Sequence, residues 1–189
     1  GYMFHSYNDF KMNINNDPRV LDNIKNTGLV KKIGVSVYSN DEIEDLLNFK
    51  NINLIQLPFN LFDNQYQRKE ILEKAKKRNI EIHTRSVFLQ GLFFKNINTL
   101  NNFLSPLKNN LIELNSILKS YNIDMNSLAL NYSINKSYID KVLIGVDSLE
   151  QLQENIKALQ TTGLTSVFKE IDDIQIKEKE LLNPSLWKI

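Results

Sequence analysis

Short apolar runs alternate along the chain with longer segments in which apolar residues recur at helical spacing. A strand buried on both faces is apolar throughout, whereas a surface helix is apolar on one face only, so this alternation is typical of a parallel sheet covered by helices. The pattern predicts five strands, at residues 2–5, 32–37, 54–57, 81–85 and 142–144. It therefore indicates an α/β fold.

The segments between the predicted strands have the spacing of amphipathic helices. Gly28 is placed to end the helix before the second strand, and Asn40 or Asp41 to begin the next one. Apolar faces are formed by Val20, Leu21 and Ile24, by Ile43, Leu46 and Leu47, and, after the fifth strand, by Leu149, Leu152, Ile156 and Leu159. We expect all of these faces to belong to the core.

Five consecutive βα units fit either an open doubly wound sheet or the last part of an eight-stranded barrel. An open dinucleotide-binding sheet should carry a Gly-x-Gly-x-x-Gly turn after its first strand, and the six glycines of the chain form no such turn. The barrel is therefore favoured. No linker or internal repeat divides the sequence, so residues 1–189 are predicted to form a single domain.

The amino-acid composition argues against several classes of binding partner and of chemical site. Lys and Arg number 23 against 22 Asp and Glu, and a net charge of +1 gives no reason to expect a nucleic acid or an anionic membrane. The chain has no cysteine, which excludes disulfides and thiolate chemistry. No apolar run approaches the roughly 20 residues that span a bilayer. We expect a cytoplasmic protein.

Five segments resemble, in order and spacing, the landmarks of the aldo-keto reductase family. They read Lys-Ile-Gly-Val-Ser at 32–36, Ile-Gln-Leu-Pro-Phe-Asn at 55–60, Thr-Arg-Ser-Val-Phe-Leu-Gln-Gly-Leu at 84–92, Leu-Ile-Gly-Val at 143–146 with Glu-Asn at 154–155, and Asn-Pro-Ser-Leu-Trp at 183–187. Each segment is weak evidence alone. Because all five occur in the family's order across nearly the whole chain, the chain is identified as a member.

The resemblance implies a (β/α)8 TIM-type barrel, truncated here to its C-terminal five βα units, the fourth to eighth strands. It also implies an oxidoreductase that uses NADP(H) or NAD(H) to reduce an aldehyde or ketone on a small or sugar-like molecule. His5, at the end of the first predicted strand, matches the family's catalytic His, which hydrogen-bonds the substrate oxygen. The family's catalytic Tyr, Lys and Asp match no residue here. The chain is thus expected to be a fragment, weakly active or inactive alone.

The cofactor side of the family's site matches more of this sequence. Ser36 and Gln56 match residues that hydrogen-bond the nicotinamide carboxamide, and Arg85 stands where an aromatic side chain commonly stacks on the ring. Further along, the matches are Ser86 and Leu89 in the phosphate-facing loop, and Glu154 and Asn155 at the adenine.

Four positions depart from the family's pattern or fall outside it. Val37 replaces an Asn that contacts the carboxamide. Gly145 and Gln151 stand where many members have the basic residues that hold the 2′-phosphate, so the choice between NADP(H) and NAD(H) is left open. His83 has no family match and is expected to point to the barrel wall or the helix layer. With no acidic partner spaced for a ligand set, we expect no metal site.

Two other interpretations stay open. A partial barrel could serve as a non-catalytic module that binds a nucleotide or a partner protein. Its two open sheet edges would need cover, and self-association is one way to supply it. The other interpretation, a complete doubly wound domain of unrelated function, requires the order of the motifs to be accidental.

Overall fold

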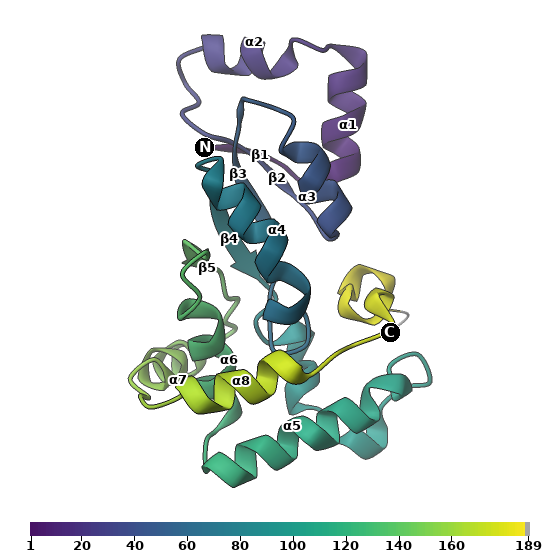
Figure 1. The fold of residues 1–189 in the computed structure, drawn as a ribbon, viewed down its shortest axis with the longest axis vertical. Coiled ribbons are helices and arrows are strands. Elements are labelled where there is room, and N and C mark those ends of the chain that lie inside the picture. The colour runs from purple at the N-terminus through teal and green to yellow at the C-terminus, as the bar shows by residue number, and fades with distance from the viewer. Residues whose placement is uncertain (188–189) are drawn as a thin grey trace. The chain divides into compact units, whose positions relative to one another are not determined.

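A computed structural model describes residues 1–187 of the chain (Figure 1). The chain divides into two compact units that alternate along the sequence. The first unit contains residues 1–58, 68–85 and 137–141, and the second contains residues 59–67, 86–136 and the chain from 142 onward. Because neither unit is a continuous stretch of sequence, the division does not decide whether they fold separately. The single domain therefore stays a prediction.

The first unit is built on a sheet whose strands follow the order of the chain. Four of them pair in parallel with their sequence neighbours, which is the arrangement that consecutive βα units produce. The strands are β1 (Tyr2–Phe4), β2 (Ile33–Ser36), β3 (Ile52–Pro58), β4 (Glu81–Arg85) and, beside β4, the two-residue β5 (Lys141–Val142). The predicted α/β fold is confirmed, although the fifth strand is shorter than predicted and begins one residue earlier.

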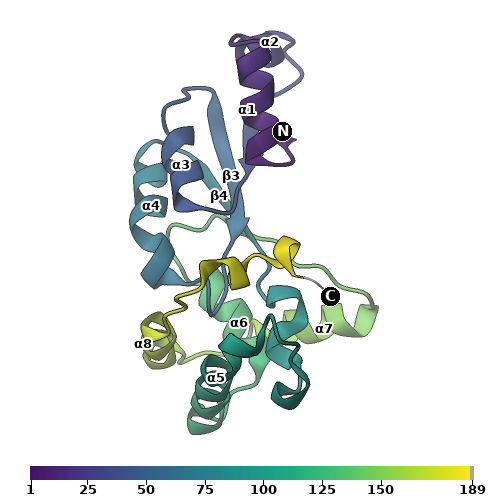
Figure 2. The same ribbon diagram turned by 90° about the vertical axis from the view of Figure 1, so that its right-hand side faces the viewer.

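Helices cover one face of this sheet, as Figure 2 shows for α3 and α4. The buried row Phe4, Val35, Ile55 and Ile82 runs across the four parallel strands, and the ring of Phe10 in α1 packs edge-on against Phe4. This row is therefore the helix-facing side of the sheet. The helices are α1 (Tyr7–Asn16), α2 (Val20–Asn26), α3 (Asn40–Leu46) and the part of α4 (Gln65–Lys77) that starts at Arg68.

Two helix ends test the predicted caps. Gly28 follows α2 with a φ of +73°, and its N–H donates to the Lys25 carbonyl at 3.0 Å, as expected of a glycine that terminates a helix. The predicted N-cap of α3, Asn40 or Asp41, is wrong by one or two residues. Ser39 is its N-cap, because the Ser39 hydroxyl accepts from the Glu42 N–H while the Glu42 carboxylate accepts from the Ser39 N–H.

The second unit consists of helices and short 3-10 turns. Its most buried element is α6, where eight of the ten residues are buried. The α-helices are α5 (Lys108–Tyr121), α6 (Met125–Ile134), α7 (Leu149–Ala158) and α8 (Thr165–Asp173), and the 3-10 helices are η1 (Leu89–Phe94), η2 (Ile97–Thr99), η3 (Ser105–Leu107), η4 (Lys179–Leu182) and η5 (Pro184–Leu186).

The apolar face of α7 is exposed, which corrects the expectation that it belongs to the core. Leu149 is 64% exposed and Ile156 is 55% exposed, and Leu152 and Leu159 are also exposed. The helix instead buries Asn155 and Ala158. Helical spacing shows that one face is apolar, but it does not show which face the rest of the chain covers.

Candidate functional site

A row of polar side chains crosses the open face of the sheet in the first unit. Ser36, Gln56 and His83 are register partners on β2, β3 and β4. Their chain neighbours Val35, Ile55 and Ile82 form the row that faces the helices, so these three side chains lie on the opposite face.

His5 directly follows β1, which is the edge strand of the sheet, and it is exposed. The structure thus pairs Ser36 with Gln56, the two residues predicted to contact the nicotinamide carboxamide. The role of His5 in catalysis and those of Ser36 and Gln56 in cofactor binding stay predictions.

Arg85 ends β4 beside Pro58 and is held by the loop after β2. Its guanidinium carbon lies 4.3 Å from the centre of the Tyr38 ring, and its Nη2 donates to the Val37 carbonyl at 3.4 Å. This is a cation–π arrangement, and the hydrogen bond to the Val37 carbonyl supports it. Val37 therefore contributes its carbonyl here, while its side chain is buried.

Of the two positions expected for His83, the barrel wall and the helix layer, the helix layer is wrong, because His83 belongs to a charged cluster on the opposite face of the sheet. Its Nε2 lies 2.7 Å from Glu81 Oε1, and Lys141 reaches the same carboxylate oxygen at 3.3 Å. Lys32 forms an ion pair with the other oxygen. Hydrogen bonds from Lys32 first, then from His83 and Lys141, lower the pKa of Glu81 from 4.5 to about 2 against the opposing effect of burial.

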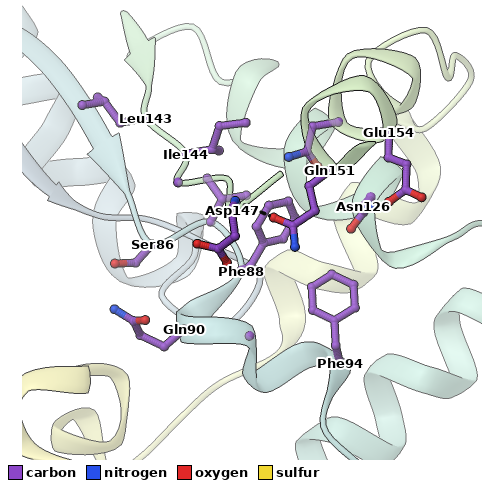
Figure 3. Close-up of a pocket in the computed structure, with 14 residues that line it drawn as sticks. Ser86, Phe88, Gln90, Phe94, Asn126, Leu143, Ile144, Asp147, Gln151 and Glu154 are labelled. Carbon is purple, nitrogen blue, oxygen red and sulfur yellow. Dashed lines mark hydrogen bonds between the residues drawn. The ribbon is translucent and has the colours of Figure 1, made fainter. Parts of the chain in front are cut away.

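The second unit contains a cavity of about 640 Å³ (Figure 3). Three predicted cofactor residues, Ser86, Glu154 and Asn155, line it together, although they come from two distant segments of the chain. Gly145 and Gln151 also line it. Leu89 does not, because its side chain is fully buried, and its predicted cofactor contact is not tested by this arrangement. The other lining residues are Val87, Phe88, Gln90, Gly91, Phe94, Asn126, Leu143, Ile144 and Asp147.

The loop beneath the cavity has an unusual backbone. Ser86, Leu89 and Gln90 have φ values of 60°, 44° and 53°, and Gly91 follows at 74°. A left-handed backbone at non-glycine residues costs free energy and is concentrated at functional sites. Asn60 supports the loop, since its Nδ2 donates to the Ser86 carbonyl at 3.2 Å. Sequence reasoning assigned Asn60 no role, although it ends the second family-like segment.

Asn60 is itself held in place. It is fully buried, and its Oδ1 accepts from the N–H groups of Phe62 and Asp63 at 2.9 Å. The carbonyl of Ser86 is therefore positioned by a side chain that has little freedom to move.

The amino end of α7 forms another wall of the cavity. Ser148 caps the helix, since its hydroxyl accepts the Gln151 N–H, and the side-chain Oε1 of Gln151 accepts the Asp147 N–H at 2.8 Å. Figure 3 shows the side chains of Asp147 and Gln151 close together at the cavity. Backbone and Ser148 hydrogen bonds lower the pKa of Glu150 in the first turn. The Asp-Ser-x-x-Gln pattern could have revealed this cap from sequence, but not its place at a cavity.

Apolar and aromatic groups complete the walls. The rings of Phe88 and Phe94 lie 5.6 Å apart, and Leu143 and Ile144 line the cavity as well. Small-ligand sites commonly measure 300–1,000 Å³ and combine apolar walls with a few polar groups. The residues present thus fit the adenosine end of a dinucleotide, with flat walls for the base and polar groups for the ribose.

Tyr, Lys and Asp, the residue types missing from the predicted catalytic set, do meet elsewhere in the second unit. Lys136 Nζ lies 3.2 Å from Asp172 Oδ1 and 4.0 Å from the centre of the Tyr132 ring, and the Tyr132 hydroxyl donates to the same carboxylate. Tyr132 is fully buried, Lys136 is nearly so, and neither lines the cavity described above. This cluster is a structural network that joins α6 to α8.

Residues 2–176 match the family described as Aldo/keto reductase. The chain belongs to the aldo/keto reductase family. A search of the curated proteins finds no match. Among the residues described, no three His, Cys, Asp or Glu side chains gather as a metal site would require, and no helix has the length and apolar character needed to cross a membrane.

Solved structures of family members share the fold. The aldo-keto reductase AKR11C1 from Bacillus halodurans, in its holo form, superposes with a TM-score of 0.65 at 19% identity, covering 84% of this chain and 54% of that one. Gox0644 in its apo form gives 0.66 at 14%, covering 94% and 59%. The thermostable Tm1743, in complex with the inhibitor epalrestat, gives 0.59 at 18%, covering 92% and 58%. The chain thus spans little more than half the length of these relatives.

Proposed function

We propose that this chain binds NAD(P)H and that, within a longer aldo/keto reductase, it takes part in reducing an aldehyde or ketone on a small or sugar-like molecule in the cytoplasm. The observation that carries the proposal is the cavity of the second unit. Ser86, Glu154 and Asn155, chosen from the sequence as cofactor contacts, line that one cavity. Family membership supports the same chemistry.

Each proposed role follows from the match of that residue to the family's pattern. Bound NAD(P)H would supply the hydride. Ser36 and Gln56 would orient its carboxamide, and His5 would donate a hydrogen bond to the substrate oxygen as negative charge develops there. Glu154 and Asn155 would hold the adenosine end. Because no residue is assigned as the proton donor, we expect the chain alone to turn over substrate slowly or not at all.

Dinucleotide binding tests the proposal without relying on turnover. Isothermal titration of the chain with NADH and NADPH should show saturable binding of at least one of them. Asn155→Ala should weaken that binding about tenfold, roughly 1.4 kcal/mol, because it removes a buried amide from the cavity wall. Asn109→Ala, an exposed position on α5, is the matched control and should bind as the unmodified chain does.

Thermal unfolding of Asn155→Ala and Asn109→Ala shows whether weaker dinucleotide binding comes from a lost contact or from loss of the folded state. If the well-folded chain bound neither dinucleotide up to about 1 mM, cofactor binding by this chain would be rejected.

A second candidate function, a non-catalytic partner-binding module, is favoured by the exposed apolar face of α7. Leu149 and Ile156 project from this face, and Leu143 and Val146 are exposed on the segment before it. Apolar patches of this kind commonly mark interaction sites. We propose that a second copy of the chain covers this face, because an identical apolar stripe is self-complementary in chemistry and C2 pairing is the commonest oligomeric arrangement.

A further inference from the structure

The cavity in the second unit has acidic side chains in its wall as well as apolar ones. Asp147 and Glu154 both line it, while none of the fourteen lining residues is Lys, Arg or His. Its wall therefore carries two formal negative charges and no positive side chain. Lys157 lines an adjoining hollow, which it shares with Glu154 and Asn126.

The amino end of α7 opposes these charges only in part. A helix amino terminus is equivalent to about half a positive charge. Ser148 already accepts one of the N–H groups there, and the carboxylate of Glu150 stands in the first turn. Since half a unit of positive charge is smaller than two formal negative charges, the cavity is negative on balance.

NAD(H) and NADP(H) differ at the adenosine ribose. In NAD(H) the 2′-hydroxyl is free and can donate a hydrogen bond to a carboxylate, whereas NADP(H) carries a phosphate there that sites usually neutralise with Arg. We infer that Asp147 and Glu154 accept the unmodified ribose and repel the 2′-phosphate, so that this chain selects NAD(H) over NADP(H). The inference rests on the proposed function, because it requires a nicotinamide dinucleotide to bind in this cavity.

The size of the effect is limited by solvent. Both carboxylates are exposed, so water and salt screen their repulsion of a phosphate. We expect NADH to bind about tenfold more tightly than NADPH at low ionic strength, with the ratio falling toward about 2 in 0.5 M salt.

The test is isothermal titration of the whole chain with NADH and with NADPH, repeated on charge-neutralised variants. Asp147→Asn combined with Glu154→Gln keeps the side-chain shapes and should bring the affinity ratio to about 2 or below, mainly through tighter NADPH binding. The control combines Glu113→Gln on α5 with Asp173→Asn at the end of α8. Both control positions are exposed and outside the cavity, so this equal change in net charge should leave the ratio unchanged.

Each outcome decides the inference. A high NADH preference that only the cavity variant abolishes supports it. Equal binding of the two cofactors, or a preference for NADPH, overturns it while leaving the proposed function intact. A preference that survives in the cavity variant overturns the assignment to these two carboxylates. Failure of the folded chain to bind either cofactor refutes the proposed function, and the inference with it.

Discussion

At the scale of single residues, Glu81 makes a pH-dependent contribution to stability. Its pKa falls from 4.5 to about 2 in the folded chain, so the folded state holds the carboxylate in its charged form. The resulting stabilisation is fully present above pH 4.5 and is lost as the pH falls through about 2. Because Lys32 and Lys141 are themselves exposed, we expect a contribution of about 1–2 kcal/mol after screening.

Urea denaturation of Glu81→Gln checks this expectation. The variant should unfold about 1–2 kcal/mol more easily than the original chain at pH 7, and the difference should shrink between pH 4.5 and pH 2. Glu113→Gln, exposed on α5, serves as the control and should change little at any pH. A Glu81→Gln effect that is the same at pH 7 and pH 3 would show that lost contacts other than the charge interaction are responsible.

Single residues also show what the sequence could reveal about the site. Ser86, Glu154 and Asn155 were identifiable because they stand in ordered segments whose spacing resembles the family. Asp147 and Asn60 were not, because their importance depends on which backbone groups and which cavity they meet in space. His83 was predicted to point to the barrel wall or the helix layer, and its contact with Glu81 was not predicted, although Glu81 is two residues away and therefore shares its face of the strand.

At the scale of elements, the strands were predictable and the helix faces less so. β4 has its predicted bounds, and its residues alternate between partly exposed and buried positions, as successive residues of a strand do. The apolar stripe of α7 was recognisable as a stripe. Its exposure was not predictable, since it depends on which other elements the chain supplies to cover it.

The polar network between α6 and α8 carries the prediction at this scale. Asp172→Asn removes the negative charge that faces nearly buried Lys136 and should destabilise the chain by about 2–3 kcal/mol, because the ammonium group in this poorly solvated position then loses its ion pair with Asp172. Asp173→Asn changes the neighbouring, exposed carboxylate and should cost less than about 0.5 kcal/mol.

A double-mutant cycle distinguishes a charge effect from general disruption of α8. Adding Lys136→Met to Asp172→Asn should recover at least about 1 kcal/mol of the loss measured in urea, because the ammonium group is then removed as well. The losses of stability in Asp172→Asn alone and in Lys136→Met alone could instead simply add in the double variant. In that case the ion pair contributes nothing, and the hydrogen bonds that join Asp172 to Gln65 and Tyr132 account for the stability of the network.

At the scale of the whole molecule, self-association through α7 is the property to measure. Leu149→Ser with Ile156→Ser removes the two most exposed apolar side chains of the helix. If a second copy covers this face, the chain should sediment as a dimer above low micromolar concentration, and the variant should shift toward the monomer by about tenfold or more in dissociation constant. Since neither side chain is buried within the chain, thermal stability of the variant at high dilution should be unchanged.

The control is Ile112→Ser on α5, which removes an exposed apolar side chain, 49% accessible, from a different helix of the same unit. Loss of the dimer in both variants would indicate nonspecific apolar association, and a monomer at all concentrations would exclude self-association through α7. Because the amino end of α7 also lines the cavity, NADH titration of the Leu149→Ser and Ile156→Ser variant adds a second measurement. Unchanged NADH affinity in the monomeric variant would show that the cavity binds its ligand without a partner copy, which separates the two proposed functions of this helix.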